Sequence, residues 1–251
     1  MVALNTSLFA GVAAADNLNG LTTINTEDSS NQRSTSHNQD NLIKSQISAQ
    51  KFKNINTLVY VPPRRGSPKR RVGAATRGAE KSLNIVSLSP NHTGLTTKSQ
   101  PVLFYYLSDT TDKAIEFTLI QEGMDDPLIE TILEASSKGI HSIDLSRFEK
   151  KLSLDVEYRW FVSLIVNENH RSNDIVSGGY IRYLPASAKL NREITKSSPS
   201  KTPSLYAQAG IWYDTLQLVD QQIKIGNHKN NAEQQFLTLL KQINIDYIQI
   251  D

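Results

Sequence analysis

The sequence predicts a mainly β protein: an antiparallel β-sandwich with a helical C-terminal tail and a polar N-terminal arm. Three observations predict this class. Short apolar segments separated by turn residues occupy residues 82–185, which is typical of antiparallel sandwiches. After Pro185 apolar residues recur at steps of three and four, as they do on one face of a helix. Residues 16–57 are instead rich in Asn, Ser, Thr, Gln and Asp.

Length and composition allow a compact domain and exclude several kinds of chemistry. The chain has 251 residues, 38% of them hydrophobic, and 27 basic against 25 acidic side chains. Because the charges nearly balance, any electrostatic function must come from local clustering. The absence of cysteine excludes disulfides, thiol nucleophiles and cysteine-ligated zinc. No apolar stretch reaches the roughly 20 residues of a membrane-spanning helix.

The N-terminus carries a candidate export signal. Residues 8–15 form a short apolar run that ends in small residues before Asp16, as at the end of a signal peptide. Residues 1–7 lack the Lys and Arg of such signals, so an incomplete signal and a plain apolar leader both stay open. We assign residues 1–15 to this leader and residues 16–57 to a disordered linker, because so polar a segment cannot offset the entropy of ordering.

A basic segment, the strap, follows at residues 58–81. Its glycines and prolines indicate irregular structure rather than a helix. The candidate contacts for an anionic partner are its arginines and first lysine: Arg64, Arg65, Lys69, Arg70, Arg71 and Arg77. Such binding would fall steeply with salt. We favour a structural strap, neutralised in part by acids of the fold such as Glu116, Asp155 and Glu157.

Seven strands are expected within residues 82–185. They lie near residues 83–86, 102–107, 114–121, 128–133, 140–145, 156–166 and 175–184. Turn residues at 125–127 and 138–139 separate some of them. Ile115, Phe117 and Leu119 alternate with polar residues, which predicts a half-buried strand.

The strand near residues 156–166 suggests the topology. It is apolar on both faces over its second half, so it should be central. Tyr158, near its start, has the spacing of a tyrosine corner, in which the hydroxyl bonds an upstream backbone group. This favours an immunoglobulin or fibronectin type III-like sandwich. Gly178-Gly179 within a later strand is interpreted as a bulge rather than a phosphate cradle.

Residues 186–251 form the helical tail. One amphipathic helix is expected over residues 204–223, stopped by Gly226, and a second over residues 231–243. Both apolar stripes should pack on the sandwich. Trp212 is expected to anchor the first helix while Asp214 meets a basic residue, and a ligand site at these residues is the alternative.

An ordered set of short motifs resembles the bacterial domain-of-unknown-function family 928 over roughly residues 59–251. The motifs span residues 65–78, 95–97, 101–106, 114–117, 158–161, 178–182 and 211–216. The resemblance implies no activity, cofactor or catalytic residue. Members of that family usually look exported, which favours the export signal at the N-terminus.

No motif in the chain indicates catalysis. The five histidines are scattered, so we expect no metal site, and no nucleophile elbow, Walker loop or dinucleotide fingerprint is present. Asp125-Asp126 is interpreted as a turn rather than a catalytic carboxylate pair. Four aromatic residues are assigned to core packing rather than sugar stacking: Tyr105, Tyr106, Tyr158 and Trp160. No catalytic, cofactor or metal site is assigned.

These observations favour a non-enzymatic, extracytoplasmic binding or accessory module, periplasmic or secreted. Its sandwich would present loops and the strap to a protein or polysaccharide partner. The first alternative is a hydrolase of cell-envelope carbohydrate, which facing carboxyl groups in an open cleft would favour. The second is binding of an anionic polymer through the strap. Nucleic acid is a disfavoured partner, since no recognised reading module is present.

Overall fold

The structure is a computed structural model that describes residues 58–63, 71, 83–134, 137–226 and 229–248. The predicted leader, the predicted linker and most of the strap lie outside these residues. The strands are β1 (Ile85–Ser87), β2 (Gly94–Thr96), β3 (Val102–Leu107), β4 (Ile115–Gln121), β5 (Pro127–Leu133), β6 (Gly139–Asp144), β7 (Glu157–Leu164) and β8 (Ile175–Tyr183). The α-helices are α2 (Ala188–Lys196), α3 (Thr202–Gln208), α4 (Trp212–Ile225) and α5 (Lys229–Gln242). Short 3-10 helices are η1 (Leu145–Arg147), η2 (Arg171–Asn173) and η3 (Pro199–Lys201).

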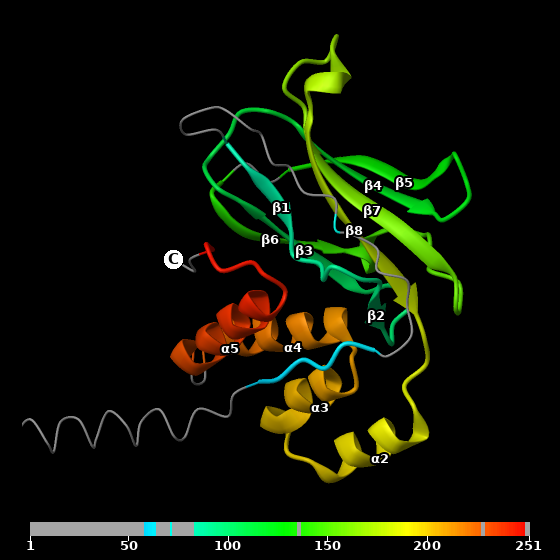
Figure 1. Ribbon diagram of the computed structural model, residues 1–251, viewed down its shortest axis with the longest axis vertical. Helices are drawn as coiled ribbons and strands as arrows, with labels where there is room; N and C mark the ends of the chain where they lie inside the picture. The colour runs from blue at the N-terminus through cyan, green and yellow to red at the C-terminus, as the bar shows by residue number, and fades with distance from the viewer. Residues whose placement is uncertain (1–57, 64–70, 72–82, 135–136, 227–228, 249–251) are drawn as a thin grey trace, which may run out of the picture. The chain divides into compact units, whose positions relative to one another are not determined.

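Two sheets build the β part of the molecule (Figure 1). One has the order β1-β3-β6 and the other β2-β8-β7-β4-β5. Strand β1 contacts β7 and β8 of the second sheet, so the sheets pack against each other. The mainly β prediction with C-terminal helices is thereby confirmed.

Strand β2 departs from the expected pattern. It pairs with β8 in parallel, with Gly94 opposite Ile181 and Thr96 opposite Tyr183, so the prediction of an entirely antiparallel sandwich is wrong here. Only three residues long, it has no alternating pattern of sufficient length to be recognised. Its pairing depends on the open edge of β8, which is far away in the sequence.

The seven predicted strands are present with small shifts at their ends. Strand β4 shows why alternation of apolar and polar residues predicted a strand. Phe117 and Leu119 are buried and lie opposite Val162 and Trp160 of the central strand β7. Burial on one face and polarity on the other produce the period of two. The predicted turn at residues 125–127 also joins β4 to β5.

The aromatic residues considered as a sugar platform lie in the core. Their exposed fractions are 1% for Tyr105, 7% for Tyr106, 1% for Tyr158 and 0% for Trp160. A ligand from solvent cannot stack on rings so covered. Core packing, the favoured interpretation, is confirmed.

Tyr158 forms the predicted corner contact. Its hydroxyl oxygen accepts a hydrogen bond of 3.0 Å from the backbone N–H of Ser153, five residues upstream. The bond holds the chain that enters β7. The contact is confirmed, although it does not by itself establish an immunoglobulin topology.

Tyr158→Phe is expected to lower the free energy of unfolding by about 0.5–1.5 kcal/mol, because one hydrogen bond is lost while the ring stays packed. Urea denaturation followed by fluorescence measures the change. Tyr206→Phe is the matched control, since Tyr206 is only half-buried on α3 and should change stability by less than about 0.5 kcal/mol. Equal stability of the Tyr158 variant and the parent would show that the corner contributes nothing.

Gly178 and Gly179 do not mark a bulge. The β7–β8 register runs unbroken from Glu157 opposite Arg182 to Leu164 opposite Ile175, so that interpretation is wrong. A Cβ on Gly178 would overlap the carbonyl oxygen of Trp160, and one on Gly179 would overlap the Ser89 side chain. Gly178 therefore leaves room for the neighbouring strand β7 of the same sheet, and Gly179 for Ser89, which follows β1.

The helical tail contains one more break than expected. The single helix predicted over residues 204–223 is two helices, α3 and α4, separated at Gly210, which has a φ of +77°. A Cβ at Gly210 would lie 2.9 Å from the carbonyl oxygen of Val61. The break thus lets the segment Leu58–Pro63 pass close to the helices. Gly226 ends α4 in the left-handed conformation, as predicted.

Helix α2 was missed by sequence reasoning. Ser187 caps its N-terminus by accepting a hydrogen bond from the N–H of Leu190, and Leu190 is its buried residue. The helix has nine residues and buries one of them, so its apolar stripe is too short to be recognised. Among the described residues no helix is long and apolar enough to cross a membrane.

Candidate functional site

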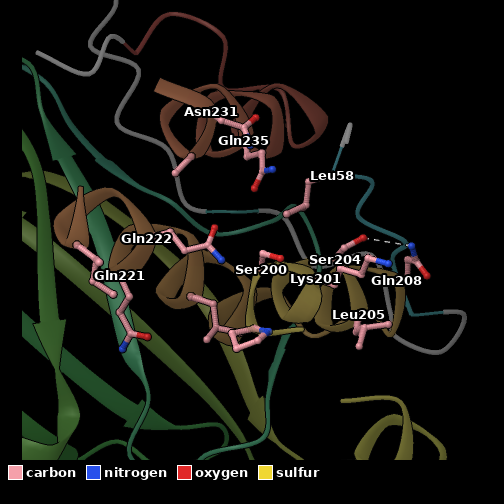
Figure 2. A pocket seen from close by; sticks show the side chains of 14 residues that line it. Leu58, Ser200, Lys201, Ser204, Leu205, Gln208, Gln221, Gln222, Asn231 and Gln235 are labelled. Atoms are coloured by element: carbon pink, nitrogen blue, oxygen red, sulfur yellow. Dashed lines mark hydrogen bonds between the residues drawn. The ribbon is translucent and has the colours of Figure 1, made fainter. Parts of the chain in front are cut away.

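A groove with a volume of about 750 Å³ lies among α3, α4 and α5, with η3 and Leu58 completing its lining (Figure 2). We call it the amide groove after the five amide side chains that line it: Gln208, Gln221, Gln222, Asn231 and Gln235. Leu205, Leu218 and Ile225 are among its aliphatic lining residues. Its size is in the range of binding pockets.

The segment Leu58–Pro63 helps to hold the groove helices in place. The side chain of Gln242 donates a 2.9 Å hydrogen bond to the carbonyl oxygen of Leu58 and accepts one of 2.8 Å from the N–H of Tyr60. The N–H of Val61 donates to the carbonyl oxygen of Ala207 at 3.0 Å. Because these bonds tie the segment to both α5 and α3, they fix the separation of the two helices.

The groove's amides are largely available to a ligand. Gln208 donates to the Ser204 hydroxyl at 3.3 Å, as Figure 2 shows. In the part of the chain that the structure describes, Gln221, Gln222 and Gln235 make no side-chain hydrogen bond, nor does Asn231. Each amide offers both donors and an acceptor. The groove is therefore suited to binding through hydrogen bonds.

The amide groove has few ionisable side chains. Lys201 is the one charged residue among the described residues that line it, and no carboxyl or imidazole group lines it. Acid–base catalysis needs such groups within hydrogen-bond reach of a substrate. The lining fits recognition better than reaction.

The aromatic motif at the start of α4 is structural. Trp212 is fully buried, and its Nε1–H donates a 2.9 Å hydrogen bond to the carbonyl oxygen of Leu88. Phe104 of β3 packs edge-to-face on Phe236 of α5, which adds a second contact between sheet and helices. The ligand-site alternative for Trp212 is excluded because a ligand could not reach it.

Asp214 has a different partner from the one expected. Its carboxyl group accepts hydrogen bonds from the Thr96 hydroxyl at 2.7 Å and the Thr97 N–H at 3.0 Å, and also from the Thr97 hydroxyl. The prediction of a basic partner is wrong. Thr96, at the end of strand β2, and Thr97, which follows it, bring three donors to the buried carboxyl group, so hydrogen bonds take the place of a counter-charge.

Tyr213, between Trp212 and Asp214, connects α4 to strands β7 and β8 of the five-stranded sheet. Its hydroxyl accepts from Trp160 Nε1 at 2.8 Å and donates to the carbonyl oxygen of Tyr180 at 3.0 Å. Burial raises the pKa of Tyr213, so the hydroxyl keeps the proton that it donates. A Cβ on Gly94 would lie 2.6 Å from the Tyr213 ring. The first turn of α4 is thus bonded to β2, β7 and β8 of the five-stranded sheet and to Leu88, which follows β1.

Of the six candidate strap residues, the structure describes Arg71. Its Nη1 donates to the carbonyl oxygen of Ser89 at 3.3 Å, and burial lowers its pKa. This contact supports a structural role at that position. Five candidates lie outside the described residues: Arg64, Arg65, Lys69, Arg70 and Arg77.

The three acids proposed to neutralise the strap form ion pairs with arginines elsewhere in the fold. Asp155 and Glu157 lie 3.5 Å and 3.3 Å from the guanidinium of Arg182, which belongs to β8. Glu116 lies 2.8 Å from Arg171. The charges of these acids are therefore at least partly compensated within the sandwich.

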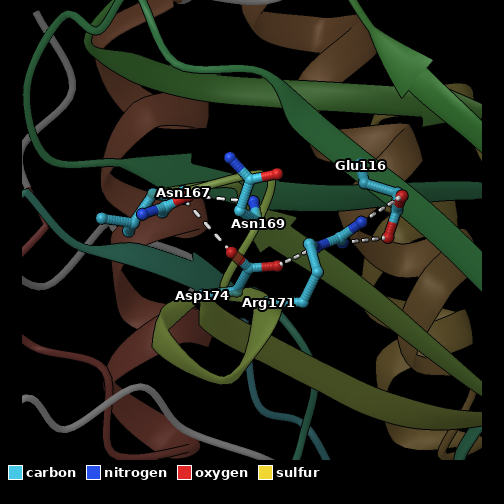
Figure 3. Close-up of polar contacts among 6 residues, drawn as sticks. Glu116, Asn167, Asn169, Arg171 and Asp174 are labelled. Atoms are coloured by element: carbon cyan, nitrogen blue, oxygen red, sulfur yellow. Dashed lines mark hydrogen bonds and ion pairs between the residues drawn. The ribbon is translucent and has the colours of Figure 1, made fainter.

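Figure 3 shows two carboxyl groups that lie close to one arginine, Arg171. Arg171 bridges Glu116 of β4 and Asp174, with its Nε 2.5 Å from the Asp174 carboxyl oxygen. Asp174 also accepts from the N–H of Val166 at 3.2 Å. Hydrogen bonds to Glu116 and Asp174 raise the pKa of Arg171. The cluster fastens the β7–β8 loop, and both carboxyl groups are engaged in doing so.

The described histidines lie apart from one another. His92 stacks on Tyr60 and His141 stacks on Tyr105, with ring centroids 5.9 Å and 5.1 Å apart. Within the described residues no three His, Cys, Asp or Glu side chains are close enough to hold a metal ion.

Comparison with protein families decides the assignment of the chain. Residues 72–251 match the family described as Domain of Unknown Function (DUF928). The chain belongs to the DUF928 family. The resemblance seen in the short motifs is thereby confirmed. A search of curated proteins found no match. In this DUF928 protein the segment Leu58–Pro63, which ties the groove helices together, precedes the matched region.

Sequence reasoning missed the amide groove. Gln221 and Gln222 lie on the polar side of α4, where glutamine is ordinary for a solvated helix face. Their meeting with Gln235 depends on how α5 packs on α4. A pattern within a single helix does not contain that information.

Proposed function

We propose that this DUF928 protein is a non-enzymatic binding or accessory module that acts outside the cytoplasm and binds a segment of a partner protein in the amide groove. The observation that carries the proposal is the set of amides without side-chain partners among the described residues, beside aliphatic side chains. A peptide backbone also carries a donor and an acceptor at nearly every residue. Amides can therefore pair with it while the aliphatic residues receive its apolar side chains.

A protein partner suits this lining better than a polysaccharide or a hydrolase substrate. The described residues that line the groove include no aromatic ring on which a sugar could stack. They also include no carboxyl group, whereas glycoside hydrolysis ordinarily requires two. The amide groove thus favours binding over cleavage.

The location of the protein and the topology of its sandwich are also part of the proposal. Location outside the cytoplasm is supported by the apolar run at residues 8–15 and by the resemblance to a family whose members usually look exported. An immunoglobulin or fibronectin type III-like topology is supported by the Tyr158 corner, while the parallel β2 favours a variant of that topology.

Photocrosslinking in the native host tests the proposal. A photoreactive amino acid replaces Gln221 of the groove, or Ser142, an exposed residue of β6, as the control position. We expect a discrete protein adduct from position 221 and none from position 142. Cell fractionation should place the adduct outside the cytoplasm.

A second substitution makes the result specific for the groove. Ser204→Arg, which narrows the groove, should reduce the adduct at position 221 by about tenfold or more, a loss of about 1.4 kcal/mol in binding. Ser142→Arg should leave it unchanged. Adducts of equal strength at both positions, a carbohydrate adduct, or a cytosolic location would each contradict the corresponding part of the proposal.

A further inference from the structure

Strand β5 leaves one side of the five-stranded sheet open. Among the described strands it is the last in the order and pairs with β4 alone, and Figure 1 shows it beside β4 at that edge. No backbone hydrogen bond from another described residue reaches its outer side. In an antiparallel pair, alternate residues point their N–H and C=O groups away from the partner strand. Such an edge can accept a further strand.

Acidic residues lie within β5 and on both sides of it along the chain. Residues 122–134 carry five acids and no basic residue: Glu122, Asp125, Asp126, Glu130 and Glu134. Asp125, Asp126 and Glu130 are exposed, as is Glu134. Glu122 pairs with Arg159 at 2.9 Å, whereas no ion pair is formed by Glu130 with any described residue. A strand that docks here meets negative charge.

Exposed apolar surface accompanies the charge. Ile132 is 54% exposed and lies two residues from Glu130, on the same face of β5. Leu128 lies at the register shift opposite Leu119 and Ile120 and packs against the core. Pro127 protects the start of the strand only, because the remaining six residues keep their N–H groups. Natural edges are commonly blocked by lysine, proline or a β-bulge. In β5 the proline and the register shift both lie at the start, between Pro127 and Ile129, so residues 130–133 are the open part of this edge.

We propose that β5 is a docking edge for an extended, basic segment of a partner protein, which adds to the sheet as a sixth strand. Hydrogen bonds between the two backbones supply affinity whatever the sequence of the added strand, and side-chain contacts supply the specificity. A Lys or Arg of the partner faces Glu130, and a β-branched residue lies beside Ile132. Cross-strand pairs of opposite charge and of apolar side chains are the favoured neighbours in such a sheet.

A second copy of the chain is a poorer occupant. Symmetric antiparallel pairing about the middle of β5 would place the two Glu130 side chains opposite each other, and like charges so placed repel. Acidic neighbours on both copies would add to the repulsion. Charge therefore selects a basic strand over self-association.

The test uses the full chain and two labelled synthetic peptides. The first alternates lysine with valine and threonine, and the second has glutamate in place of each lysine. We expect the lysine peptide to bind, as measured by fluorescence anisotropy, and to slow amide hydrogen exchange in β5. The Glu130→Lys variant should bind this peptide about fivefold to tenfold more weakly and should gain binding of the glutamate peptide.

Glu149→Lys is the matched control, since Glu149 is also exposed and the net charge changes equally. It should leave both affinities unchanged. The proposal is overturned if the lysine peptide binds more weakly than about 1 mM, if Glu149→Lys weakens it as much as Glu130→Lys, or if exchange slows outside β5. Concentration-dependent dimerisation through β5 would equally overturn it. Because β5 and the amide groove share no residue, either proposal can fail without the other.

Discussion

Replacing Trp212 with alanine is expected to lower the free energy of unfolding by about 3–5 kcal/mol, the cost of removing a large buried aromatic side chain. Trp212 is 0% exposed. Its indole bonds the carbonyl oxygen of Leu88, and the ring of Tyr60 packs edge-on at a centroid distance of 4.9 Å. Alanine would leave a cavity where α4, the sandwich and the Leu58–Pro63 segment meet.

Two further variants separate the contributions to this effect. Trp212→Phe keeps an aromatic ring but removes the bond to Leu88, so its loss should be clearly smaller than that of the alanine variant. Ile225→Ala lies on the same helix at a position 70% exposed, and should change stability by less than about 0.5 kcal/mol. Guanidinium denaturation measures all three. A loss below about 1.5 kcal/mol for Trp212→Ala would show that the surroundings collapse into the space or that the ring is not buried.

Asp214→Ala is expected to cost about 2–4 kcal/mol, because three buried or half-buried donors lose their acceptor together. The donors are the hydroxyl of Thr96 and the N–H and hydroxyl of Thr97. Asp214 itself is 2% exposed, so water cannot easily replace it. Strand β2 should loosen from its place between β8 and α4.

Asp214→Asn and Thr97→Val test this explanation. Asparagine retains one oxygen acceptor and the size of the side chain, so its loss should lie between zero and that of alanine. Thr97→Val removes a single hydroxyl donor and should cost less than Asp214→Ala. Hydrogen exchange of the β2 amides measures the local effect alongside denaturation. Equal stability of the alanine and asparagine variants would contradict a role for hydrogen bonding.

Both predictions concern a helix with two different faces. One face of α4 buries Trp212, Leu216 and Val219 against the rest of the fold. The other contributes Gln221 and Gln222 to the amide groove. Because one rigid element carries both faces, a variant that shifts the anchor should also alter the groove. Binding assays on Trp212 variants therefore need stability measurements beside them.

The candidate sites differ in how far the sequence could reveal them. The strap was recognisable because six basic side chains lie close together along the chain, from Arg64 to Arg77. The amide groove was not, because its glutamines come from separate helices and each is unremarkable in its own helix. The acidic edge of β5 lies between: its charges are local, but its open side depends on the strand order.

Local side-chain periodicity by itself determined seven of the eight described strands and most of the helical tail of this DUF928 protein. Ile115, Phe117 and Leu119 mark β4 since burial on one face of a strand repeats every second residue. The stripe through Trp212, Leu216 and Val219 marks α4 for the corresponding helical reason. Both periodic patterns can be recognised in the sequence because each arises within a single strand or helix.

Only the tertiary structure decided what each element meets. Asp214 bonds Thr96 across 118 positions of sequence, β2 runs parallel to β8, and Val61 passes close to Gly210, where the predicted helix is broken. In each case a backbone or polar group is satisfied by a partner from a distant segment. Residue types report whether a side chain is buried, whereas the identity of such a partner depends on how the whole chain packs.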